Sequence, residues 1–109
     1  MAKPKPKPKA EKPEPSAPPP PLTPRPGAEF KRDLKRLKKR GKDMDKLRAV
    51  VETLCAHGQL APRHRDHALT GDMKEWRDCH IEPDWILIYR EIGSKLELGR
   101  TGTHADVLE

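Results

Sequence analysis

The chain has 109 residues, with 23 Lys or Arg against 17 Asp or Glu and a formal net charge of +6 at pH 7. This length allows one small domain, and no stretch reaches the roughly 18 apolar residues of a membrane span. Two cysteines without metal-ligand spacing argue against a disulfide scaffold, and the basic N-terminus lacks the apolar core of a secretory signal. We therefore expect a protein of the reducing cytoplasm that does not enter a membrane.

Residues 1–28 are rich in proline and lysine. They hold eleven of the thirteen prolines and six Lys or Arg against two acids. So few apolar side chains cannot offset the entropy of ordering, and alternating prolines favour extended polyproline II segments. We predict a disordered tail over residues 1–28 and a folded domain over residues 29–109. A domain of that size is marginally stable alone, and a bound partner could supply stability.

Two helices are predicted at the start of the folded part. Residues 29–40 carry apolar side chains at helical spacing, with basic side chains on the other faces. Lys31–Lys42 contains eight basic residues and one acid, a pattern that suits a polyanion or an acidic protein, although a solvated helix face gives the same pattern. Asp43 is a plausible cap for a second helix that ends near Gly58.

Three strands are predicted after a polar loop at 59–71. They span 75–81, 85–92 and 95–102, and short links make both junctions antiparallel hairpins. The middle strand is apolar on both faces, which indicates a central position. The sequence therefore predicts an α+β fold in which two N-terminal helices pack on a small antiparallel sheet.

The hairpin geometry predicts which residues meet. A turn at Gly93-Ser94 sets a register in which Leu87 faces Arg100 and Trp85 faces Gly102. A slip of one residue would turn side chains to the opposite face. Polar and aromatic residues are then expected to border one edge of the sheet: His80, Asp84, Trp85, Arg100 and His104.

These residue types suit cleavage of RNA through its own 2′-hydroxyl. Histidine can act as base or acid near neutral pH, and aspartate can orient a histidine. Arginine offers paired donors to a phosphate, and tryptophan can stack on a base. Purely structural roles remain open as alternatives: Trp85 as a core residue, Asp84 as a turn residue and Arg100 as a solvated strand residue. This chemistry requires no cofactor, and no metal-ligand spacing is present.

Four motifs in order resemble the YafQ-type toxins of the RelE/ParE superfamily of bacterial toxin–antitoxin systems. They lie at 42–47, 66–71, 76–89 and 100–104, and the resemblance covers residues 29–109. It implies a RelE-like fold and a ribosome-dependent endoribonuclease that cleaves translated mRNA in the A site by metal-free acid–base catalysis. It also implies a cognate antitoxin, mRNA and ribosomal RNA as partners, with operator DNA bound only through the antitoxin complex.

Carried over by position, the resemblance implies roles for individual residues. The catalytic acid–base set would be His67, His80, Asp84 and His104, with Arg100 stabilising the phosphate. Trp85 would contact an RNA base or act as a scaffold. RNA contacts from the first helix would come from Lys31, Arg32, Lys35, Arg36, Lys38 and Lys39.

Two departures from the family pattern support alternative hypotheses. Relatives usually begin with a β-strand before the first helix, but Pro18–Pro26 occupies that place, and proline cannot donate ladder hydrogen bonds. Leu108 stands where the family tends to have phenylalanine. The second hypothesis is therefore a catalytically impaired toxin remnant that binds its antitoxin and the operator complex. A third is the same fold directed at another target, as in relatives that poison gyrase.

Overall fold

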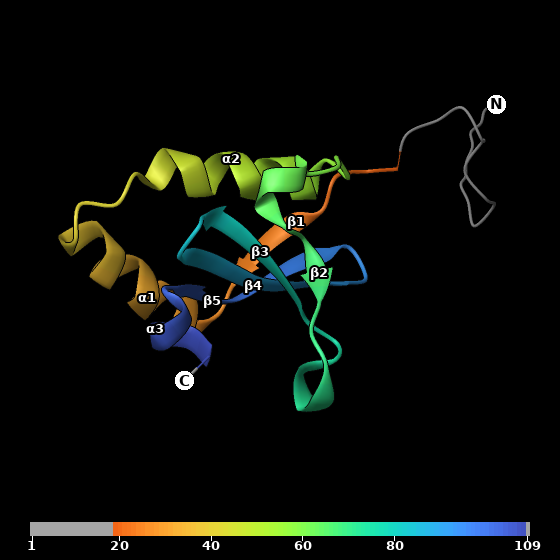
Figure 1. Ribbon diagram of the computed structural model, residues 1–109. Coiled ribbons are helices and arrows are strands. Elements are labelled where there is room, and N and C mark those ends of the chain that lie inside the picture. The colour runs from red at the N-terminus through yellow and green to blue at the C-terminus, as the bar shows by residue number, and fades with distance from the viewer. Residues whose placement is uncertain (1–18, 109) are drawn as a thin grey trace, which may run out of the picture.

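The computed structural model describes residues 19–108 (Figure 1), so residues 1–18 of the predicted disordered tail lie outside it. The helices and strands are, in chain order, β1 (Thr23–Pro26), α1 (Ala28–Lys39), α2 (Met44–Cys55), β2 (His67–Ala68), β3 (Arg77–Glu82), β4 (Trp85–Ile92), β5 (Lys95–Gly102) and α3 (His104–Leu108). Short 3-10 turns at Pro62–His64 and Gly71–Met73 flank β2.

The two predicted helices are confirmed, and local chemistry explains their ends. After α1, Gly41 adopts φ +80°, a left-handed conformation that glycine tolerates at a helix C-terminus. The Asp43 carboxylate then accepts a hydrogen bond from the Asp45 backbone N–H at 3.0 Å and caps the N-terminus of α2. The chain therefore turns sharply between two amphipathic helices.

The sheet has the order β1-β5-β4-β3-β2, with antiparallel pairing from β5 to β2. The predicted three-stranded meander is confirmed, but the sheet is mixed rather than purely antiparallel because β1 runs parallel to β5. The expectation that prolines remove the first strand is wrong. β1 lies at the sheet edge, where a missing donor is tolerated, and the flanking N–H groups of Thr23 and Gly27 bond to Ser94 and Leu98 at 3.0 Å. Ordered structure therefore begins before the predicted boundary at residue 28.

A bulge in β5 shifts the predicted register by one residue. Near the turn, pairing follows the prediction as far as Tyr89 with Leu98, but Ile88 then pairs with Arg100, which leaves Gly99 as the extra residue. A Cβ on Gly99 would lie 2.9 Å from the Trp76 ring, so only glycine fits there without movement. Because side chains alternate along a strand, the bulge places Arg100 opposite Ile88, which is outside the main core cluster, rather than opposite Leu87.

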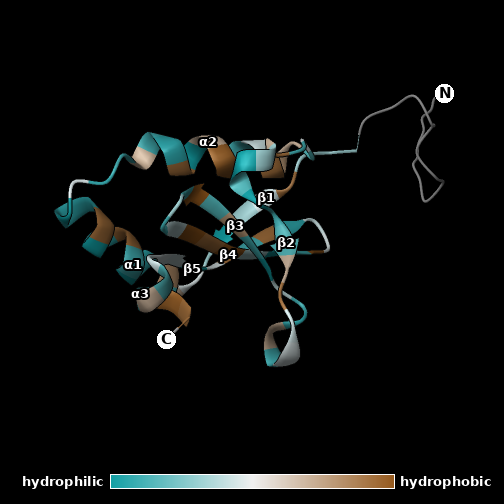
Figure 2. Ribbon diagram, viewed as in Figure 1, coloured by the Kyte–Doolittle hydropathy of each residue, from teal (hydrophilic) through white to brown (hydrophobic). Residues whose placement is uncertain are grey.

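Helix α2 lies over one face of the sheet, and α1 lies beside the sheet next to β5 (Figure 1). Their buried Phe30, Leu37, Leu47 and Val50 share a core cluster with strand residues of β3, β4 and β5. Figure 2 shows β4 largely in hydrophobic colours and both helices in mixed colours, as expected for half-buried helices on a central strand. Within residues 19–108, no helix is long and apolar enough to cross a membrane.

Candidate active site

Three of the predicted site residues meet at one end of the sheet. His104 Nδ1 lies 2.8 Å from Asp84 Oδ1, and the His104 backbone N–H donates to the same oxygen at 3.2 Å. The rings of His80 and His104 are 5.3 Å apart between centroids, at 64° to each other. This cluster joins the last part of β3, the turn between β3 and β4, and the first residue of α3.

The contact with Asp84 defines which nitrogen of His104 is available. The hydrogen bonds from the His104 side chain and backbone hold the pKa of Asp84 below its usual value, so its carboxylate is ionised near neutral pH and can only accept. Nδ1 of His104 is therefore the donor, and Nε2 remains for a substrate. A carboxylate–imidazole pair of this kind fixes the orientation of the ring.

His67 lies beside this cluster rather than in it. It is on the edge strand β2 opposite Asp78, with Nε2 3.7 Å from Asp78 Oδ2. Asp78 is two positions from His80 on β3, so His67 and His80 are on the same face of the sheet. Asp78 is 3% exposed, and its Oδ1 has no hydrogen-bond partner within the described residues. The Asp78 carboxylate therefore lies close to the His67 ring without a hydrogen bond between them.

Arg100 is held by an acid that is distant in sequence. Its Nε and Nη2 bond to the Asp33 carboxylate of α1 at 2.8 and 3.3 Å, and Nη2 also donates to the Asp106 carbonyl at 3.1 Å. Burial opposes ionisation of Asp33, but hydrogen bonds from Arg100, the Thr101 backbone and Arg36 lower its pKa. Across residues 19–108 no hydrogen bond engages Arg100 Nη1, so the guanidinium is fixed with one amino group available to a phosphate.

Trp85 does not fit the predicted contact with an RNA base. Its side chain is fully buried, with Nε1 donating to Thr101 Oγ1 at 2.9 Å, and Lys42 Nζ lies 5.7 Å from the ring centroid. A ring with no exposed face cannot stack on a base, so the scaffold alternative is the one that fits. Leu108 lies at the end of α3 and is 44% exposed, without the aromatic surface usual at this position in the family.

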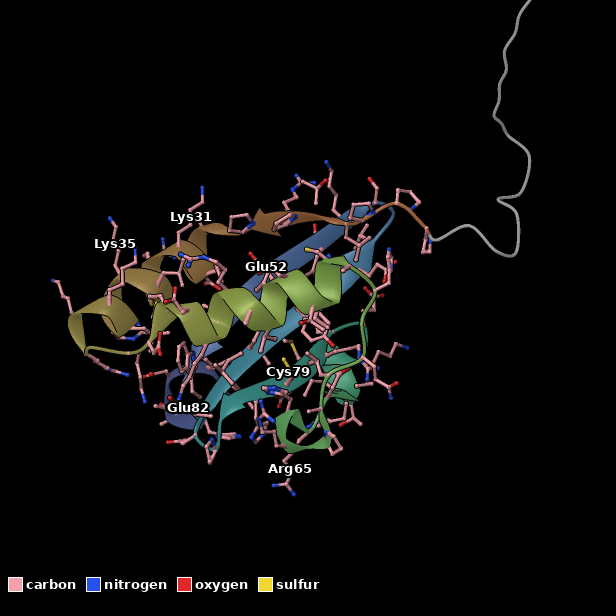
Figure 3. The ribbon with its side chains drawn as sticks, turned by 90° about the horizontal axis from the view of Figure 1, so that it is seen from above. Lys31, Lys35, Glu52, Arg65, Cys79 and Glu82 are labelled. Carbon is pink, nitrogen blue, oxygen red and sulfur yellow. The ribbon has the colours of Figure 1, made fainter. Side chains whose placement is uncertain are left out.

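Five of the six basic α1 residues predicted to contact RNA are exposed, and the sixth pairs with an acid. Lys31 and Lys35 project away from the body of the molecule (Figure 3), and Arg32, Lys38 and Lys39 are also exposed. Arg36 differs, because its Nη2 lies 2.6 Å from Asp33 Oδ1. It stabilises the carboxylate that holds Arg100, so its guanidinium is engaged by an internal acid although 37% of the side chain is exposed.

Two acids in and around the site, Asp33 and Asp106, were not predicted from the sequence. A hint of the role of Asp33 was present in the sequence, because it is the one acid among the eight basic residues of Lys31–Lys42. A hint was also present for Asp106, since Thr103 and Asp106 match the spacing of a helix capping box. Within residues 19–108, no group of three or more His, Cys, Asp or Glu side chains is placed to hold a metal ion.

Comparison with known proteins gives consistent matches. The family model described as "Bacterial toxin of type II toxin-antitoxin system, YafQ" matches residues 22–109. The chain is 44% identical over 79 residues to the mRNA interferase toxin YafQ of Escherichia coli K12, which covers 72% of this chain and 86% of that protein. It is 37% identical over 67 residues to a putative toxin YafQ of Haemophilus influenzae, covering 59% and 66% of the two chains. The crystal structure of the E. coli DinJ-YafQ toxin-antitoxin complex matches with a TM-score of 0.75 and 38% identity, over 81% of this chain and 98% of that one.

Proposed function

This chain belongs to the YafQ family of toxins from type II toxin–antitoxin systems, and we propose that it is a ribosome-dependent endoribonuclease that cleaves translated mRNA in the A site. The observation that carries this proposal is the cluster of His80, Asp84 and His104, in a chain that is 44% identical to a protein named mRNA interferase. Two histidines and a carboxylate are the groups that acid–base cleavage of RNA needs.

In the proposed reaction the RNA 2′-oxygen attacks the adjacent phosphorus. A base removes the 2′-hydroxyl proton, the bond to the 5′-oxygen breaks, and an acid protonates that leaving oxygen. The products are a 2′,3′-cyclic phosphate and a 5′-hydroxyl. His104 is suited to be the acid because Asp84 holds its ring through Nδ1 and leaves Nε2 available to the leaving oxygen. His80 is suited to be the base, with His67 as a further histidine on the same face of the sheet.

Arg100 is suited to stabilise the negative charge that develops on the phosphate. Its two bonds to Asp33 fix the plane of the guanidinium before substrate arrives, and a fixed donor costs little reorganisation during the reaction. Because Asp33 is buried, this arrangement does not depend on ordering a surface side chain.

The exposed side chains of α1 fit contacts with ribosomal RNA. Lys31, Arg32 and Lys35 present a positive surface that would bring the toxin to a polyanion in a salt-dependent manner. Related toxins have been crystallised with the antitoxin DinJ. We propose a cognate antitoxin for this chain as well, with operator DNA bound only through that complex, and a cytoplasmic location in which ribosomes are available.

The experiment that tests this function is cleavage of a defined message on purified ribosomes. We expect cuts at discrete in-frame positions that require ribosomes and are about 10²–10⁴-fold slower in His104→Ala, because acid catalysis is lost. His57→Asn is a matched control: it changes an exposed histidine after α2, and asparagine tolerates the left-handed φ of +61° there. Full cleavage by a folded His104→Ala protein would refute the mechanism.

A toxin remnant that only binds its antitoxin is the second candidate, and Leu108 favours it because this position offers no aromatic surface. The other reason for that hypothesis no longer applies, since β1 is present. A folded wild-type protein that binds its antitoxin but leaves ribosome-bound message intact would support the remnant, whereas discrete cuts would eliminate it.

A further inference from the structure

Asp106 occupies a position where several site elements join. It is in the first turn of α3, two residues after His104. The Asp106 backbone N–H donates to Thr103 Oγ1 at 3.0 Å, and the Thr103 backbone N–H donates to Asp106 Oδ2 at 3.1 Å. This reciprocal pair is a capping box, which satisfies orphan donors and sets where a helix begins. The helix begins at His104.

The same carboxylate ties α3 to α1. Arg40 donates to both Asp106 oxygens, at 2.8 and 3.4 Å, and Arg36 Nε lies 3.9 Å from Oδ2. The hydrogen bond from Arg40 holds the pKa of Asp106 well below its usual value, so the group is charged throughout the neutral range. A helix of five residues does not hold its shape in water by itself. Contacts from outside α3 therefore set its orientation.

The backbone around Asp106 is also adapted to this contact. Gly102, the last residue of β5, has φ +153°, and a Cβ there would lie 3.0 Å from Asp106 Cβ and Oδ2. Only glycine allows this approach without movement. In addition, the Asp106 carbonyl accepts a hydrogen bond from Arg100 Nη2 at 3.1 Å. One residue thus contacts the proposed phosphate-binding arginine and fixes the turn that carries the proposed acid.

We propose that Asp106 is a positioning residue, which holds His104 against Asp84 by anchoring α3 to Arg40. This inference rests on the proposed function. Asp106 has no direct part in the reaction, because its oxygens are already engaged by Arg40 and Thr103. Its effect is on the geometry of His104, and a misplacement of about 1 Å in a reacting group can cost about 10²-fold in rate.

The test compares Asp106→Ala, Asp106→Asn and Asp45→Ala in the full chain. Asp45 is the matched control, because it is also an aspartate in the first turn of a helix that pairs with an arginine, Arg48, at 2.6 Å. On ribosome-bound message we expect Asp106→Ala to lower kcat about 10–100-fold with KM nearly unchanged. We expect a smaller loss for Asp106→Asn, which keeps an oxygen for the capping box, and no loss for Asp45→Ala.

Two readouts separate positioning from a general structural role. The first is the double variant Asp106→Ala/His104→Ala, which we expect to be no slower than His104→Ala alone, because Asp106 acts through His104. The second is the ¹⁵N NMR signature of the His104 ring, which we expect to lose its Nδ1-protonated state in folded Asp106→Ala. Additive losses, or a wild-type ring signature and wild-type kcat in either Asp106 variant, would overturn the inference. If the wild type itself does not cleave message, the proposed function fails, but the NMR comparison still tests the position of His104.

Discussion

Replacing Asp33 by alanine tests how far burial strengthens an ion pair in this protein. The Asp33 side chain is 3% exposed and receives hydrogen bonds from Arg100, Arg36 and the Thr101 backbone. Removing it leaves a half-buried Arg100 guanidinium without its carboxylate and the buried Thr101 N–H group without a partner. Breaking a buried charge pair in this way costs about 3–5 kcal/mol. That is a large part of the roughly 5–15 kcal/mol that keeps a small domain folded.

The chain offers an internal control with the same geometry. Asp33–Arg36 and Asp45–Arg48 are both pairs at i and i+3 on a helix, and both have a shortest distance of 2.6 Å. They differ in exposure, because the Asp45 side chain is 81% exposed. Exposed pairs contribute about 0–1 kcal/mol, so Asp45→Ala is expected to change the unfolding free energy little.

The assay is urea denaturation at pH 7 followed by circular dichroism. We expect Asp33→Ala to lower the midpoint strongly at an unchanged slope, and Asp45→Ala to leave both within error. Because Arg100 loses its anchor, Asp33→Ala should also slow cleavage of ribosome-bound message. If Asp33→Ala costs no more than Asp45→Ala, burial does not strengthen this carboxylate, and the reasoning is wrong.

The pH dependence gives a second check with a definite sign. The pKa of Asp33 is lower in the folded state than its usual value of 3.8. The stability from this group is therefore fully present above about pH 4–5 and is lost as the pH falls through the folded pKa. Both proteins should lose unfolding free energy on acidification, because they share the other carboxylates. The loss should be steeper in the wild type than in Asp33→Ala, because only the wild type has Asp33. Parallel curves for the two proteins would contradict the lowered pKa.

Two further substitutions test the packing around the site. Trp85→Phe removes the hydrogen bond to Thr101 but keeps most of the buried ring. We expect the unfolding free energy from urea denaturation to fall by about 1–2 kcal/mol, and the KM for ribosome-bound message to stay unchanged. A raised KM would instead favour contact with an RNA base. Tyr89→Phe removes the 2.5 Å hydrogen bond to Asp66, the residue before His67. Because the edge strand β2 is then less well held, we expect the unfolding free energy to fall by about 1–2 kcal/mol and cleavage to become slower. Wild-type stability of Tyr89→Phe would mean that this bond contributes nothing to holding β2.

Local patterns in the sequence were sufficient to predict most of the helices and strands of the fold. The spacing of apolar residues in α1 and the Asp43 cap of α2 act within a few residues of each other, and the Gly93-Ser94 turn places β4 and β5 side by side. The sequence also brings His80 and Asp84 together, because a short turn connects their strands. These features depend on neighbours along the chain, which a single sequence displays.

Only the tertiary structure decided the rest, because those features depend on contacts between distant segments. β1 forms despite its prolines because β5 offers a parallel edge more than 60 residues away in sequence. Only glycine fits at position 99 of the bulge because the Trp76 ring occupies the space of a side chain, and the bulge pairs Arg100 with Ile88 instead of Leu87. Arg100 then meets Asp33 across 67 positions, and Arg40 meets Asp106 across 66. No periodicity connects residues so far apart; packing of α1 and of α3 against β5 does.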